Sequence, residues 1–171
     1  METVKQTSKE YLKTLSILHL ALTVSPVIFG LVGFYLISIG SILIDSAVLD
    51  MVFTYIVPVF IVGGVFGSNW IYKNKLNQLK EENDFNLKMS SFRGALILRY
   101  ALLEGPALFS VVVAMITSNP LFLVFTGIMV GFMFYWKPTK DTVIADLQLS
   151  QQEIIILENP DAIIAEWESV D

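Results

Sequence analysis

The chain has 171 residues, of which 54% are hydrophobic and only 16% are charged, and its formal net charge is −5. A soluble domain is about half apolar and about a quarter charged, so the scarcity of charge and the mean hydropathy of +0.65 indicate a surface that faces lipid. There is no cysteine and a single histidine, His19. Disulfide frameworks, cysteine nucleophiles and metal sites of clustered cysteine or histidine are therefore excluded.

Four apolar runs have the length of membrane spans. A transmembrane helix needs about 20 mostly apolar residues, and the runs cover 15–38, 51–72, 94–117 and 121–136. No small-residue cleavage site follows the first run, so we expect it to be a span and not a signal peptide. The sequence thus predicts an all-α membrane protein with a cytoplasmic N-terminus over 1–14, a four-helix domain over 15–136 and an acidic tail over 137–171.

The basic residues predict the orientation, because loops kept in the cytoplasm are enriched in lysine and arginine. Outside the spans they are Lys5, Lys9, Lys13, Lys73, Lys75, Lys80, Lys88, Arg93, Lys137 and Lys140, and the two loops on the other side have none. Both termini are therefore expected in the cytoplasm. The setting would be a bacterial inner membrane, with two tandem helical hairpins and a cytoplasmic aromatic belt of Trp70, Tyr72, Tyr135 and Trp136.

The first and third spans resemble each other. Aligning them places Pro26 on Pro106 and Phe29 on Phe109, and aligning the second span with the fourth places Gly63 on Gly127. This pattern predicts a duplicated hairpin whose copies are related by an axis along the membrane normal. Convergent membrane composition is the alternative explanation.

Small residues recur at i and i+4 on every span, a spacing that lets helix backbones approach closely in lipid. They are Ala21 and Ser25, Gly63 and Gly67, Ala101 and Gly105, and Gly127 and Gly131. These residues are expected to pack the helices of one bundle together, or to form the interface of a homo-oligomer or membrane complex.

Glu104 is the only carboxyl inside a predicted span, near the membrane midplane. An ionised side chain there costs at least ~2.5–3.5 kcal/mol, so the group should be protonated, paired or in a wet cavity. Tyr100 lies one turn earlier on the same face and is a candidate hydrogen-bond partner. The two residues form a hypothetical ion-binding site, and a neutral structural acid is the alternative. His19 and Arg99 are expected to be interfacial anchors.

Two prolines are expected to kink their helices. Pro26 and Pro106 leave the carbonyls of Leu22 and Leu102 without helical partners. At membrane depth such carbonyls must be met by neighbouring groups, water or an ion.

The segment Ala101–Ala114, with the sequence ALLEGPALFSVVVA, resembles the carboxylate helix of subunit c, the rotor-ring proteolipid of F-type and V-type ATP synthases. In that family a glycine-bearing helix is followed by a polar loop and then by the helix with the acid. On that second helix the ion-carrying acid follows an alanine-leucine pair and precedes a run of aromatic and valine residues. The resemblance covers roughly residues 51–117, with Gly63, Gly64 and Gly67 on the glycine-bearing helix. It implies that Glu104 binds and releases a proton.

The tail holds eight of the 16 acidic residues but only two of the 11 lysines and arginines. Ser150 and Glu153 fit a capping box, and Asn159-Pro160-Asp161 predicts the start of a short helix over 162–167. Residues 154–157 are either helix or strand. We expect the tail to dock on the lysines of the 73–92 loop or on a cytoplasmic protein.

No phosphate-binding glycine loop, paired carboxylates or nucleophile triad is recognisable. We therefore expect a non-enzymatic integral membrane protein without a cofactor or nucleic-acid partner, acting as an accessory or scaffolding subunit. The alternative is a proton- or sodium-translocating or sensing proteolipid that uses Glu104.

Overall fold

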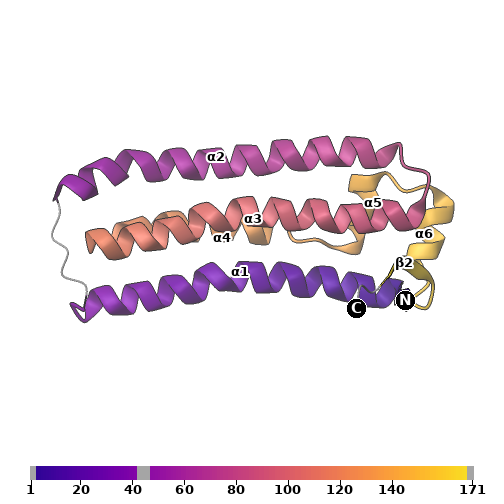
Figure 1. Ribbon diagram of the computed structural model, residues 1–171, viewed down its shortest axis with the longest axis horizontal. Coiled ribbons are helices and arrows are strands. Elements are labelled where there is room, and N and C mark those ends of the chain that lie inside the picture. Colours follow the sequence, from indigo (N-terminus) through magenta and orange to yellow (C-terminus); the bar gives the residue numbers. More distant parts are fainter. Residues whose placement is uncertain (1–2, 42–46, 169–171) are drawn as a thin grey trace. The chain divides into compact units, whose positions relative to one another are not determined.

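A computed structural model describes residues 3–41 and 47–168 (Figure 1). The elements in chain order are β1 (Thr3–Thr7), α1 (Ser8–Ser38), α2 (Ala47–Lys80), α3 (Phe85–Thr117), the 3-10 helix η1 (Pro120–Phe122), α4 (Leu123–Tyr135), α5 (Lys140–Leu147), α6 (Gln151–Glu158) and β2 (Ile163–Glu168). The helices α1, α2 and α3 are long and apolar enough to cross a membrane, and the broken helical segment that starts at Pro120 is a fourth candidate. The chain is therefore an all-α integral membrane protein with one small sheet.

The long helices extend well beyond the predicted spans. Helix α2 continues to Lys80 and α3 begins at Phe85, so only a four-residue turn separates them. The prediction of a polar loop over 73–92 is thus wrong for most of that range. Its cause is a buried apolar stripe on the extensions, which includes Leu76, Met89 and Phe92 and gives these polar segments a reason to stay helical.

The chain divides into two compact units. The polar unit contains residues 1–19, 71–98 and 137–171, and the apolar unit contains residues 20–70 and 99–136. Of the 11 lysines and arginines, only Arg99 belongs to the apolar unit. The part of α1 in the apolar unit, 20–38, has a length of about 28 Å at 1.5 Å per residue, close to the ~30 Å thickness of bilayer hydrocarbon.

The apolar unit is built around α3. Within the most apolar 18-residue stretch of each helix, 44% of α3 is buried, compared with 17% of α1 and 11% of α2. Two hydroxyls tie α3 to the next elements: Ser110 Oγ donates to the Phe122 carbonyl (2.5 Å) and Thr126 Oγ1 donates to the Ala107 carbonyl (3.0 Å). The outward side chains of the unit are large and apolar, with Tyr55 72% exposed, as expected of a surface in contact with lipid.

Glycine brings α2 against α3 at one point. A Cβ placed on Gly64 would lie 2.7 Å from Pro106 Cγ and 3.0 Å from the Leu102 carbonyl oxygen. The carbonyl without a helical partner therefore faces a residue that has no side chain. Gly33 makes a similar contact between α1 and α3, where a Cβ would lie 3.0 Å from Val111 Cγ1.

These contacts do not involve the glycines predicted from the i, i+4 spacing. A Cβ on Gly63, Gly67, Gly105, Gly127 or Gly131 would meet no atom within 4 Å, and Ala21 and Ala101 are exposed. Within the described chain these five glycines therefore make no close contact with another helix. The physical reason is helical phase: Gly64 lies about 100° around the helix from Gly63, and that rotation decides which one faces α3.

The polar unit joins the two ends of the chain. Strand β1 pairs antiparallel with β2, with Lys5 opposite Glu166. The backbone N–H of Ser8 donates to the Ala162 carbonyl (2.9 Å), and the Ser8 hydroxyl donates to the Leu157 carbonyl. Residues 163–168 are therefore a strand, and the prediction of a helix over 162–167 is wrong. The strand partner lies at the opposite end of the sequence, where local capping signals carry no information about it.

The acidic tail docks on its own chain. Ser150 and Glu153 form the predicted capping box, and α6 settles residues 154–157 as helix. Lys88 Nζ donates to Glu153 Oε1 at 2.7 Å, in an ion pair that is largely buried. Burial acts to raise the pKa of Glu153, but the hydrogen bonds from Lys88 and Ser150 outweigh it and hold that pKa below its ordinary value. Tyr72 adds a hydrogen bond to Asp146 Oδ2 (2.6 Å).

The Gly64 contact makes a matched pair of variants informative. Gly64→Ala is expected to lower the free energy of unfolding by about 1–3 kcal/mol, because the new methyl overpacks the contact with Pro106. Gly63→Ala meets open space and should change that free energy by less than about 1 kcal/mol. Detergent-induced unfolding, followed by circular dichroism, measures both. Equal effects of the two substitutions would contradict this packing.

Candidate functional site

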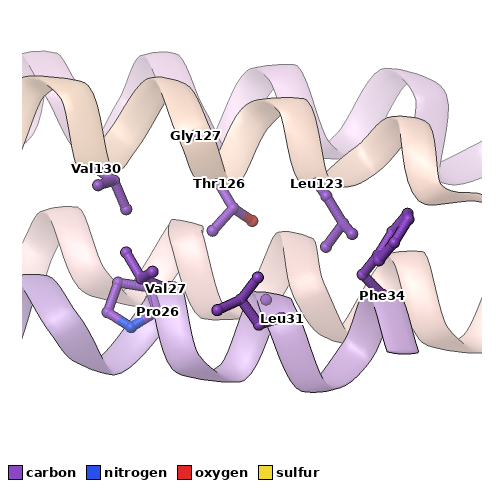
Figure 2. A pocket seen from close by; sticks show the side chains of 9 residues that line it. Pro26, Val27, Leu31, Phe34, Leu123, Thr126, Gly127 and Val130 are labelled. Carbon is purple, nitrogen blue, oxygen red and sulfur yellow. The ribbon is translucent and has the colours of Figure 1, made fainter. Parts of the chain in front are cut away.

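A groove opens on the apolar unit between α1 and α4, with a volume of about 290 Å³. Helix α1 provides Pro26, Val27, Gly30, Leu31 and Phe34, and α4 provides Leu123, Thr126, Gly127 and Val130. Figure 2 shows that the helices are antiparallel here, since Val130 lies opposite Val27 at one end and Leu123 lies opposite Phe34 at the other.

The inside of this groove is apolar. Its one side-chain hydroxyl, on Thr126, donates to the Ala107 carbonyl. The Thr126 methyl instead faces α1, because a Cβ on Gly30 would lie 3.9 Å from Thr126 Cγ2. The groove therefore offers hydrocarbon contacts and no free hydrogen-bond donor.

Glu104, on α3, is partly exposed. It shares a helix face with Val111, two turns later, and Val111 contacts the positions of Gly30 and Gly33. Since Gly33 also lies near Met115, α1 and α3 run in the same direction. By this register Thr23, two turns before Gly30, lies at the level of Glu104.

The Thr23 side chain is completely buried, and its hydroxyl has no hydrogen-bond partner among the residues that the structure describes. A buried hydroxyl without a partner costs free energy and usually marks a place where a polar group or water is needed. Thr23 is not among the residues predicted from the sequence, although a threonine inside an apolar run is a signal that could have found it.

The predicted partner of Glu104 is engaged elsewhere. The Tyr100 hydroxyl donates to the Trp136 carbonyl at 2.6 Å. A phenol has one proton to donate, so Tyr100 can meet Glu104 only as an acceptor, and only if the carboxyl is protonated. The structure thus does not supply Glu104 with a phenolic donor from Tyr100.

The predicted anchors are buried. Arg99 is 6% exposed and its guanidinium lies 4.1 Å above the Trp136 ring, a cation–π contact that stabilises a charge in apolar surroundings. It therefore lies against a residue of the predicted aromatic belt. His19, in the polar unit, is 3% exposed.

Within residues 3–41 and 47–168, no group of three or more histidine, cysteine, aspartate or glutamate side chains is placed to hold a metal ion. Comparison with models of known protein families found no match, and comparisons with curated proteins and with solved structures found none either. The resemblance to rotor proteolipids therefore rests on the residues of α2 and α3 quoted for it.

Proposed function

We propose that the protein is a non-enzymatic integral membrane subunit that works by assembly, as an accessory or scaffolding component of a membrane complex. Four helices cross the bilayer, and both termini lie in the cytoplasm. The gathering of ten of the 11 lysines and arginines in the polar unit supports this orientation, because basic segments are retained on the cytoplasmic side.

The observation that carries assembly is the exposed face of α3. Ala101 and Gly105 are exposed at i and i+4, on the side of α3 opposite the buried Leu103 and Ala107. The most buried helix of the apolar unit thus presents a shallow strip of small residues to lipid, and such strips favour close approach of another helix. A second copy of the chain or a different membrane protein would supply that helix.

In this proposal the acidic tail is not the surface that binds a partner. Its Glu153 is paired with Lys88 and its strand β2 is paired with β1, so a cytoplasmic partner would meet a folded surface. The tail is thus a structural part of the polar unit, and we assign the assembly surface to α3.

Because the chain has no cysteine, single-cysteine variants test the assembly surface cleanly. Gly105→Cys in native membranes is expected to give a crosslinked product with a thiol-specific bifunctional reagent. Val124→Cys on α4, which is also exposed, is the matched control and should not. Equal crosslinking at both positions would argue for random collision. No product at Gly105, together with a monomeric mass of the wild-type chain in lipid nanodiscs, would contradict the proposal.

The second candidate is a proton- or sodium-responsive proteolipid centred on Glu104. The observation that favours it is the register of the partly buried carboxyl with the buried Thr23 hydroxyl. An ion, or a proton on the carboxyl, would satisfy both groups at a depth where an unpaired charge is costly.

A carboxyl-directed carbodiimide distinguishes this candidate from pure assembly, since it reacts with protonated carboxyls in apolar surroundings. The candidate predicts labelling of Glu104 that falls as the pH rises or sodium is added, and Glu104→Gln provides the unlabelled control. Absence of labelling at every pH, or labelling that ignores both sodium and pH, would remove it.

A further inference from the structure

The charges of the polar unit are unevenly distributed along the chain. The chain passes between the two units four times, and the seven residues on the polar side of each passage are 13–19, 71–77, 92–98 and 137–143. These four segments together hold six basic residues and one acidic residue, Asp141. The rest of the polar unit holds four basic and twelve acidic residues. Positive charge is therefore concentrated next to the apolar unit along the chain, although the whole chain has a net charge of −5.

Most of this positive charge is not neutralised by the acidic tail. Four lysines of these segments are exposed and form no ion pair within the part of the chain that the structure describes, and we call them the boundary lysines: Lys13, Lys73, Lys75 and Lys137. The tail carboxylates of Glu153 and Glu158 pair instead with Lys88 and Lys140. One further tail carboxylate lies near Lys73, because Asp146 accepts a hydrogen bond from Tyr72 (2.6 Å). A single carboxylate cannot neutralise four lysines, so the boundary lysines keep an excess of positive charge.

The place of the boundary lysines on the chain indicates what they bind. Helix α1 passes from the exposed apolar residue Leu20 into the segment of Lys13, and α2 passes from the exposed Trp70 into the segment of Lys73 and Lys75. On a helix seven residues rise about 10 Å, and a lysine side chain can carry its ammonium group several ångströms further toward a membrane surface. These ammonium groups therefore come within reach of lipid headgroups wherever the apolar residues meet lipid.

Charge complementarity selects the lipid. A lysine beside an anionic membrane surface is attracted by about 1 kcal/mol, whereas a zwitterionic surface has no net charge to attract it. We propose that the boundary lysines bind the phosphate groups of anionic phospholipids, so that the protein selects these lipids from among those that surround it. The proposal rests on the chain being an integral membrane protein, and it needs neither the assembly role nor the cytoplasmic orientation.

Two matched variants separate this surface from the effect of net charge. The boundary variant replaces three boundary lysines and is Lys13→Gln/Lys73→Gln/Lys137→Gln. The control variant removes the same charge from exposed positions outside the four segments and is Lys5→Gln/Lys9→Gln/Lys80→Gln. In the control, Lys9 and Lys80 are followed directly by Glu10 and Glu81, so their charge is already offset locally.

The test uses the full chain in phosphatidylcholine vesicles with a trace of either phosphatidylglycerol or phosphatidylcholine that carries a spin label on one acyl chain. Electron paramagnetic resonance measures the fraction of each lipid that is immobilised at the protein surface. We expect phosphatidylglycerol to be preferred about fivefold at low ionic strength, the ratio that ~1 kcal/mol gives. The preference should approach one in 1 M NaCl, where the Debye length is about 3 Å. The boundary variant should lose at least half of the preference, and the control should keep it.

Three outcomes would overturn the proposal. Equal immobilisation of the two lipids by the wild type would assign the boundary lysines to an acidic protein instead. An equal loss in both variants would mean that only the net charge matters, and a preference that survives both 1 M NaCl and the boundary substitutions would come from another part of the protein. Unchanged circular dichroism of the boundary variant shows that a loss of preference does not come from unfolding, and the salt dependence of the wild type tests the proposal without any substitution.

Discussion

Hydrocarbon cannot solvate a charge or an unpaired backbone group, and this constraint organises the whole molecule. It explains why only Arg99 among the basic residues belongs to the apolar unit, where it lies against the Trp136 ring. It also explains how three hydroxyls of the apolar unit are used, whereas the buried Thr23 hydroxyl has no partner among the described residues. Each of these three hydroxyls, on Ser110, Thr126 and Tyr100, donates to a backbone carbonyl. These hydrogen bonds join neighbouring elements and avoid the free-energy cost of an unpaired buried hydroxyl.

In hydrocarbon there is no hydrophobic driving force between helices, so close packing holds them together. Helix α3 occupies the buried position, and glycines on its neighbours set the approach distances: Gly64 on α2 and Gly33 on α1. Where a glycine instead faces lipid, a hollow or a flat strip results. Gly127 lines the groove and Gly105 lies on the exposed face of α3, so both features follow from the same residue type.

Much of this architecture could be predicted from the sequence because membrane spans are local. The apolar runs at 15–38 and 94–117 lie within α1 and α3, and the capping box at Ser150 and Glu153 is formed as expected. Prolines 26 and 106 also lie inside helices as predicted.

Other features depend on information that the local sequence does not contain. The strand β2 requires β1 at the far end of the chain, and the i, i+4 spacing identifies glycines without saying which face meets a neighbour. Neither the burial of Thr23 nor its register with Glu104 follows from periodicity alone. The register comes from the contacts of Gly30 and Gly33 with Val111, which are set by tertiary packing.

We propose that the polar unit lies in the cytoplasm and that the ends of α1 and α3 lie on the opposite side of the membrane. Single cysteines in a chain that has none, at the exposed positions Ser41, Glu81 and Asp141, test it with a membrane-impermeant maleimide on cells whose inner membrane is intact and accessible. We predict that Ser41→Cys is labelled at once, and that Glu81→Cys and Asp141→Cys are labelled only after permeabilisation. Labelling of Ser41→Cys and Glu81→Cys from the same side would contradict the account.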